Sequence, residues 1–197
     1  MLGVRLLLIG APGAGKGTQA TRIADHFHVA HISSGDLLRA HVINNTAIGR
    51  TAQDYMERGD LVPDEVVLDM LRKPVTEAVA AGGYVLDGFP RTVEQAEAAY
   101  AVAKDLGVAV QVAVHLAVDP ASLLERLVAR GQESGRSDDT PEIIKHRIDV
   151  YEQRTKPLLD YYAERERLIT VNGERPIDEV TWSVIVQLQK AQRLLAD

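Results

Sequence analysis

The chain has 197 residues, of which 46% are hydrophobic and 25% charged, with a net charge of −6 and no cysteine. This length suits one buried core with small insertions, and the composition argues against disorder. The negative charge disfavours nonspecific binding to nucleic acid or membrane surfaces, and the lack of cysteine excludes disulfides and thiolate zinc sites. No apolar run approaches the length of a membrane span and no secretory pattern is recognisable, so we expect a cytoplasmic protein.

Four short apolar runs, separated by amphipathic segments of helical length, predict the strands of one sheet. They cover residues 4–9, 84–86, 108–118 and 168–171. Strands that alternate with helices form parallel βαβ units, and nearly continuous apolar strands indicate a sheet covered on both faces. The sequence therefore predicts an α/β fold with a doubly wound parallel sheet of about five strands and helices on both faces.

Two stretches depart from this alternation. Residues 34–62 have a helical pattern and end at Gly59-Asp60, whereas residues 131–139 contain almost no apolar side chain and have the composition of a mobile surface loop. We expect a single domain over residues 1–197, with an inserted helical segment at 33–62 and a short lid loop at 130–140. A last helix should pack on the sheet through side chains at helical spacing. These are Ile177, Val180, Val184, Ile185 and Leu188.

The strongest motif is a glycine-rich turn directly after the first predicted strand. It reads GAPGAGKGT at residues 10–18 and opens a helix. Such a turn exposes consecutive backbone N–H groups and a helix N-terminus to an anion, and Lys16 adds a charge for the β and γ phosphates. The motif therefore predicts binding of a nucleoside triphosphate. The match to the general pattern is imperfect, because Gly17 stands where Ser or Thr is usual and Thr18 follows it.

Five motifs in order make the chain resemble the adenylate kinase family of nucleoside monophosphate kinases. They read GAPGAGKGTQ at 10–19, SSGDLLR at 33–39, GDLVPDEVV at 59–67, LDGFPRT at 86–92 and SGRSDD at 134–139. The short, cysteine-free loop resembles the short-lid branch of that family. The resemblance implies a P-loop kinase architecture and an ATP:AMP phosphotransferase of nucleotide biosynthesis and purine metabolism, with ATP, AMP and ADP as its partners.

The resemblance also implies a role for each matching residue. ATP would be held by the glycine loop and two arginines, namely Gly13, Ala14, Gly15, Lys16, Gly17, Thr18, Arg130 and Arg175. AMP would be held by Ser34, Arg39, Asp60, Leu61, Val62, Gly88, Phe89, Pro90, Arg91, Gln95, Arg136 and Arg147. The charges at the transferred group would come from Lys16, Arg91, Arg126, Arg130, Arg136 and Arg147.

The same resemblance implies Mg²⁺ as the cofactor, bound with ATP and with no certain direct protein ligand. Thr18 and Asp87 would lie near the ion, and Asp87 would meet it through water. Zinc is not expected, because the lid loop lacks cysteine. His26, His28 and His31 lie close together in the sequence but lack a metal-binding helix pattern, so we expect them to be exposed. A monomer is expected because no exposed apolar stripe stands out.

The chemistry of phosphoryl transfer supports the roles of the arginines independently of the family resemblance. Phosphoryl transfer needs positioning and positive charge more than covalent help, and a guanidinium grips two phosphate oxygens while staying ionised. Arg126 and Arg130 share one helix face because they are four residues apart. Arg147 falls between Ile143 and Ile144 inside an apolar face, where a cation should lie over a ligand or, alternatively, form an ion pair.

Acceptor choice rests on two polar side chains. The Ser34 hydroxyl stands where adenylate kinases usually have threonine and pyrimidine-specific relatives have alanine, and the Gln95 amide can also read a base. These residues favour AMP over UMP or CMP as the acceptor. A UMP/CMP kinase, a P-loop switch or ATPase, and a kinase for a non-nucleotide alcohol remain alternatives, the switch being disfavoured because no N-K-x-D motif is present.

Overall fold

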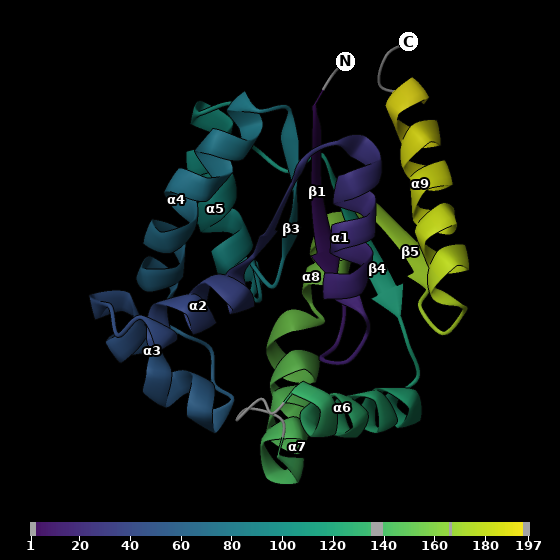
Figure 1. Cartoon of the computed structure of the whole chain (residues 1–197). Helices are drawn as coiled ribbons and strands as arrows, with labels where there is room; N and C mark the ends of the chain where they lie inside the picture. The colour runs from purple at the N-terminus through teal and green to yellow at the C-terminus, as the bar shows by residue number, and fades with distance from the viewer. Residues whose placement is uncertain (1–2, 135–139, 166, 195–197) are drawn as a thin grey trace.

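The central feature of the computed structural model, which describes residues 3–134, 140–165 and 167–194, is a parallel sheet. Within these residues the sheet has five strands in the order β2-β3-β1-β4-β5 (Figure 1). The strands are β1 (Val4–Ile9), β2 (Ala30–Ser33), β3 (Gly83–Asp87), β4 (Val112–Ala117) and β5 (Leu168–Asn172). The predicted α/β class with a parallel sheet of about five strands is confirmed.

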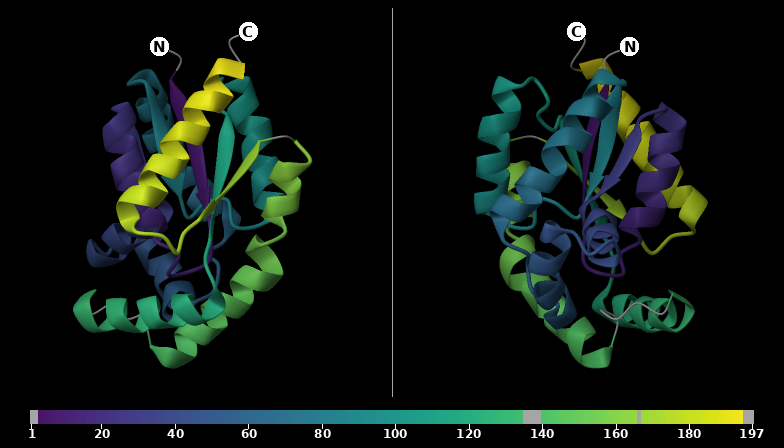
Figure 2. Two further views of the ribbon diagram at one scale, coloured as in Figure 1. Left: turned by 90° about the vertical axis from the view of Figure 1, so that its right-hand side faces the viewer. Right: turned by 60° about the vertical axis from the view of Figure 1, so that its left-hand side comes forward.

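Helices cover both faces of this sheet because its strands are apolar on both sides. Along β1, Leu6 and Leu8 belong to one buried cluster, and Leu7 and Ile9 belong to the other. The first face carries α1 (Lys16–Phe27) and α9 (Ile177–Leu194), and the second carries α4 (Asp64–Ala80), α5 (Val93–Asp105) and α8 (Leu158–Ala163). The left view of Figure 2 shows the sheet edge-on between α1 and α8.

Two groups of helices lie at the carboxyl end of the strands. On one side are α2 (Ser34–Ile43) and α3 (Ala47–Arg58), and on the other are α6 (Pro120–Ser134) and α7 (Pro141–Val150), as Figure 1 shows. A π-helical turn, η1 (Tyr151–Thr155), connects α7 to α8. Because ligands of open parallel sheets bind beyond the carboxyl ends of the strands, this end of the molecule is where a site is expected.

The sequence missed one strand and misplaced the ends of other elements. Strand β2 escaped because it is a short edge strand in which only Ile32 is buried, so it has no apolar run. The run at 108–118 begins before β4, since Val108 is buried outside the sheet and accepts a hydrogen bond from the Tyr84 hydroxyl. Residues 131–134, predicted as loop, continue α6 as helix, and residues 135–139 of the predicted lid lie outside the described residues.

The last helix packs on the sheet through most of the residues that the sequence indicated. Val180, Val184, Ile185 and Leu188 are buried, but Ile177 is 53% exposed because it stands at the first turn, beyond the edge of the core. Among the described helices, none combines the length and the apolar character needed to cross a membrane.

Candidate functional site

The glycine loop connects β1 to α1 in a conformation that needs glycine. Gly13 and Gly15 have φ angles of 84° and 88°, in the left-handed region that side chains disfavour. A Cβ atom on Gly13 would lie 2.9 Å from Cγ of Leu127, so α6 also packs closely on the loop. Gly15 caps α1 without a side-chain hydrogen bond, which leaves the first N–H groups of the helix directed at the space beyond the loop. This arrangement suits an anion.

Lys16 folds back over the loop that precedes it. Its ammonium group donates hydrogen bonds to the carbonyl oxygens of Gly10 at 2.8 Å and Ala11 at 3.0 Å. Burial lowers the pKa of Lys16, the charge of Asp87 raises it, and the charges of three arginines lower it; together they bring this pKa to about 8. The three are Arg91, Arg147 and Arg130. Several cations from separate segments therefore converge on one place.

Asp87 supplies the negative charge of this region from the end of β3. Its Oδ1 atom is buried and, within the described part of the chain, has no hydrogen-bond partner. A Cβ atom on Gly17 would lie 3.9 Å from Oδ2, so the carboxylate faces the first turn of α1, where Thr18 is also exposed. A buried carboxylate oxygen without a partner beside an anion-binding loop fits a hydrated Mg²⁺, which prefers oxygen ligands and keeps much of its water.

A hollow, here called the acceptor cavity, lies between α2, α3 and the segment that follows β3. Ten of the residues predicted to bind AMP line it. They are Ser34, Arg39, Asp60, Leu61, Val62, Gly88, Phe89, Arg91, Gln95 and Arg147. Residues from four separate segments of the sequence, 34–39, 60–62, 88–95 and 147, are thus brought together at the carboxyl end of the sheet.

The polar side chains of the acceptor cavity are held by bonds within the protein. The Gln95 side chain accepts a hydrogen bond from the backbone N–H of Arg91 at 2.7 Å and donates one to Asp64 at 2.6 Å. The Arg91 Nε–H donates to the carbonyl of Gly88 at 2.7 Å. The predicted base reader Gln95 therefore has its amide engaged by Asp64 here, and contact with a base would require an exchange of partners.

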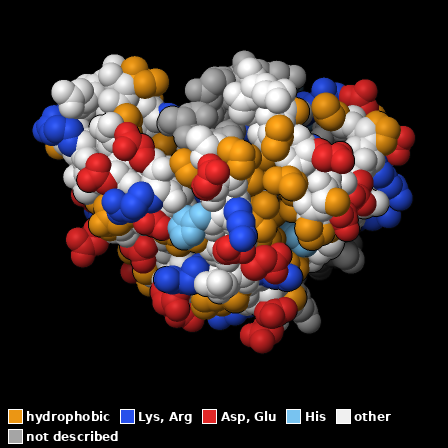
Figure 3. All heavy atoms as spheres, turned by 90° about the horizontal axis from the view of Figure 1, so that it is seen from below, with side chains coloured by type: hydrophobic (Ala, Val, Ile, Leu, Met, Phe, Trp, Pro, Cys, Tyr) orange, Lys and Arg blue, Asp and Glu red, His pale blue; other side chains and the backbone are white. Residues whose placement is uncertain are grey.

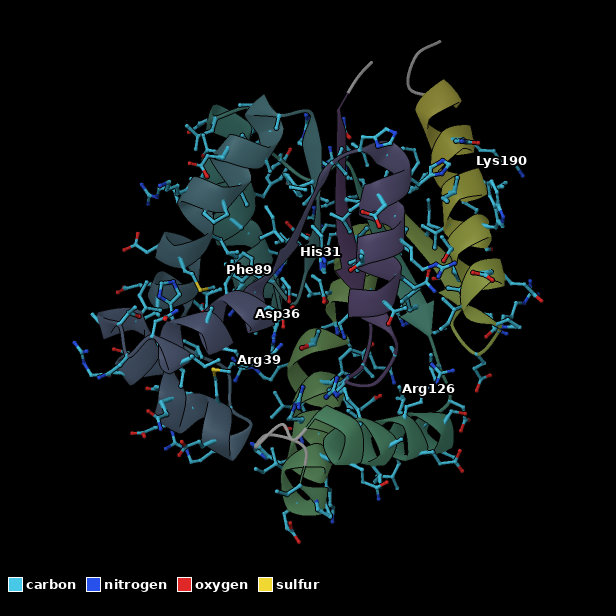
Figure 4. All side chains as sticks on the ribbon, viewed as in Figure 1. His31, Asp36, Arg39, Phe89, Arg126 and Lys190 are labelled. Carbon is cyan, nitrogen blue, oxygen red and sulfur yellow. The ribbon has the colours of Figure 1, made fainter. Side chains whose placement is uncertain are left out.

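Ser34 and Arg39 reach the same cavity from α2. Ser34 is fully buried, and a Cβ atom on Gly88 would lie 2.6 Å from its hydroxyl oxygen, so the two segments are in close contact. Arg39 forms an ion pair of 2.5 Å with Asp36, one turn earlier on α2 (Figure 4). The guanidinium is thus partly neutralised within its own helix and is about 29% exposed.

Another hollow, the loop cavity, joins the glycine loop to the acceptor cavity. Its lining includes Gly10, Pro12 and Lys16 of the loop together with Pro90. Five residues line both hollows, namely Gly59, Leu61, Gly88, Arg91 and Arg147. Two guanidinium groups, those of Arg91 and Arg147, therefore stand at the junction between the glycine loop and the acceptor cavity.

Comparison with known proteins identifies the family of this chain. A family model described as adenylate kinase matches residues 8–167. The chain belongs to the adenylate kinase family. Its relatives include adenylate kinases of Kocuria rhizophila, 43% identical over 94% of this chain and 99% of that one, and of Methylorubrum populi, 46% identical over 92% and 94%. The adenylate kinase of Leptospira biflexa is 45% identical over 92% of this chain and 97% of its own.

Two further arginines that the adenylate kinase resemblance singled out, Arg126 and Arg175, have their own surroundings. Arg126 on α6 donates a hydrogen bond to the carbonyl of Gly173 at 3.1 Å, and Figure 4 shows it on the side of the molecule opposite Arg39. Arg126 lines neither the acceptor cavity nor the loop cavity. Arg175 is exposed in the turn between β5 and α9, and Arg136 lies outside the described residues.

Sequence reasoning missed a contact that connects the acceptor cavity to α7. The Asp60 carboxylate interacts with the His146 ring at 2.8 Å and accepts a hydrogen bond from Arg58 at 3.0 Å. The hydrogen bonds from His146 and Arg58 lower the pKa of Asp60. The GD pair at residues 59–60 was the available signal, but periodicity could not reveal its distant partner.

The prediction of three exposed histidines is wrong for one of them. His26 and His28 are exposed, whereas His31 on β2 is half-buried. The His31 Nδ1 atom lies 3.3 Å from the Thr21 hydroxyl, and its Nε2 atom is buried without a hydrogen-bond partner among the described residues. The strand that was missed explains this error, since β2 places the ring against α1.

The lowered pKa of Lys16 makes nucleotide binding sensitive to pH. In the free protein the neutral amine becomes populated above pH about 8, whereas a bound triphosphate should stabilise the ammonium form and raise the pKa. ATP binding at about pH 8.5 should therefore take up a fraction of a proton, and ATP affinity should fall as the pH rises further. Titration calorimetry in two buffers of different ionisation enthalpy measures the uptake.

The matched control for this titration is Lys16→Met, which removes the titrating amine. The variant should bind ATP more weakly and with little proton uptake at the same pH. Binding heats of the unmodified chain that do not depend on the buffer would contradict the assigned role of Lys16.

Proposed function

We propose that the chain catalyses reversible transfer of the terminal phosphoryl group of Mg-ATP to AMP, giving two molecules of ADP. The observation that carries this proposal is the junction of the loop cavity with the acceptor cavity, at which Arg91 and Arg147 line both. Such a junction can bring the attacking oxygen of one nucleotide into line with the terminal phosphate of another. Membership of the adenylate kinase family supports the same reaction.

On the donor side, residues 13–18, which include Lys16, would hold the phosphates of ATP. The support is the left-handed glycine pair and the uncapped start of α1, which direct backbone N–H groups outward. Thr18 and Asp87 would hold Mg²⁺ through water, and the bound ion would supply positive charge between the phosphate oxygens. Arg126 and Arg130 would lie at the transferred group, and the charge of Arg130 does lower the pKa of Lys16. Arg130 and Arg175 would also lie toward the adenine of ATP.

On the acceptor side, Arg39 and Arg91 would bind the phosphate of AMP. A phosphate offers a doubly charged partner, so Arg39 would exchange its single ion pair with Asp36 for a stronger one. The Ser34 hydroxyl and the Gln95 amide would read the adenine, with Gln95 giving up its bond to Asp64. Adenine offers ring nitrogens that accept these hydrogen bonds, which favours AMP over UMP or CMP.

Water competes with AMP for the transferred group, so the site must close over both nucleotides. The helical segment at 33–62 and the short lid at 130–140 are the parts that we expect to move. The guanidinium groups would then surround the transition state and stabilise its spreading charge. They are Arg91, Arg126, Arg130, Arg136 and Arg147. We expect the active form to be a cytoplasmic monomer.

The decisive assay measures ADP formed from ATP and Mg²⁺ with AMP, UMP or CMP as the acceptor. We expect rapid turnover with AMP, slower turnover with either pyrimidine, and little ATP hydrolysis when no acceptor is added. Lys16→Met should lower the rate with AMP by about a hundredfold or more while leaving the fold intact by circular dichroism. A preference for UMP or CMP would instead indicate a pyrimidine kinase, and hydrolysis independent of AMP would indicate an ATPase.

Arg91→Ala should separate the two nucleotide sites. Because its guanidinium lines the acceptor cavity, the variant should raise the KM for AMP by about tenfold or more and change the KM for ATP much less. The matched control is Arg50→Ala on α3, which removes an exposed guanidinium that donates to the carbonyl of Asn45 in the turn before this helix. Equal effects of Arg91→Ala on both nucleotides would count against the placement of the acceptor.

A further inference from the structure

An apolar cavity that the proposed reaction does not use lies behind Phe89, which is part of the lining of the acceptor cavity. This rear cavity, of about 150 Å³, is enclosed by α4, β3, α5 and α8. Leu68, Leu71 and Val75 line it from α4, and Tyr84 and Tyr162 line it from β3 and α8. An apolar space of this size holds water poorly and accepts small apolar molecules.

The sequence of α5 explains why this space is not filled. Ala96, Ala99 and Ala103 stand three and four residues apart on the face that α5 turns toward the cavity. Alanine leaves a gap where larger side chains would interlock with the leucines of α4. The cavity therefore results from the small side chains on this face of α5.

The charged groups at the cavity all have the same sign. Of the described residues that line it, the ionised ones are Arg72, Arg165 and Arg167, and none is a carboxylate. Arg165 donates a hydrogen bond to the Tyr161 carbonyl at 2.8 Å, and Arg167 donates one to Val110 at 3.2 Å. A guanidinium has five N–H donors, so these bonds leave capacity for an anion. Arg72 differs in that it lies 3.8 Å from Asp69.

We propose that the rear cavity binds an amphipathic carboxylate, with its hydrocarbon tail against the alanine face of α5 and its head at Arg165 and Arg167. Burial of the tail follows from the apolar lining, and the sign of the head follows from the arginines. Decanoate is a suitable probe of this chemistry, and decanol is its neutral counterpart.

The rear cavity shares part of its wall with the nucleotide site. Phe89 lines both the rear and the acceptor cavity, and Pro90 lines both the rear and the loop cavity. A bound carboxylate therefore touches the segment that shapes the acceptor pocket, and its occupancy should change the affinity for AMP. By thermodynamic linkage, AMP should change the affinity for decanoate by the same factor. This second readout rests on the proposed function, whereas binding itself does not.

The experiment titrates decanoate, below its micelle concentration, into the full chain saturated with AMP and a nonhydrolysable ATP analogue. Calorimetry should show one saturable site, because the nucleotides fill the other cavities. Combined Arg165→Gln and Arg167→Gln substitutions should weaken decanoate by about tenfold and leave decanol unchanged, while Ala99→Leu should weaken both by filling the space. Arg50→Gln, remote from the cavity, should change neither.

Several results would overturn the proposal. Complete, competitive displacement of decanoate by the nucleotides, as opposed to a finite change in affinity that levels off, would place the ligand elsewhere, as would unchanged binding in a folded Ala99→Leu chain. If Ala99→Leu does not fold, Ala103→Leu and the arginine variants decide the matter, and equal loss of decanoate and decanol in the arginine variants would refute the assigned head group. An AMP affinity that stays constant between zero and saturating decanoate would refute the coupling through Phe89.

Discussion

The convergence of cations around one buried lysine is the interaction on which the rest of the site depends. Burial and the neighbouring guanidiniums of Arg91, Arg147 and Arg130 lower the pKa of Lys16 to about 8, and Asp87 only partly offsets them. Like charges held together in this way repel each other, and a polyphosphate relieves the repulsion. The effect is local, because the chain carries a net charge of −6 and Figure 3 shows positive and negative side chains interspersed over the end that contains the site.

The parallel sheet creates this convergence by bringing strand ends together. Strand β1 leads into the glycine loop, β3 ends at Asp87 and continues to Arg91, and β4 leads to α6 with Arg130. All of these strands run in the same direction, so their carboxyl ends lie at one edge. The helices α2 and α3 on one side and α7 on the other then add Arg39 and Arg147, and the contact between Asp60 and His146 connects the two sides.

Sequence alone revealed the features that have a local pattern. The apolar runs predicted β1, β3 and β5, and the ordered motifs predicted ten residues that do line the acceptor cavity. It failed where the structure depends on contacts between distant segments. Strand β2 has too few apolar residues to show a period. The hydrogen bond from Gln95 to Asp64 joins residues 31 positions apart, and the contact of His146 with Asp60 joins residues 86 positions apart. The rear cavity also escaped, because alanines on α5 look favourable for a helix whether or not the opposite helix fills the space.

The central claim is that the loop cavity and the acceptor cavity form one site for two nucleotides. A bisubstrate mimic, in which a chain of phosphates joins two adenosines, tests it most directly when backbone amide chemical shifts are followed during a titration. The account predicts that amides of both cavities, such as Lys16 of the loop cavity and Gly35 of the acceptor cavity, shift with one common midpoint, far below the concentration at which ATP alone saturates the loop. Shifts confined to the glycine loop, or two separate midpoints, would contradict it.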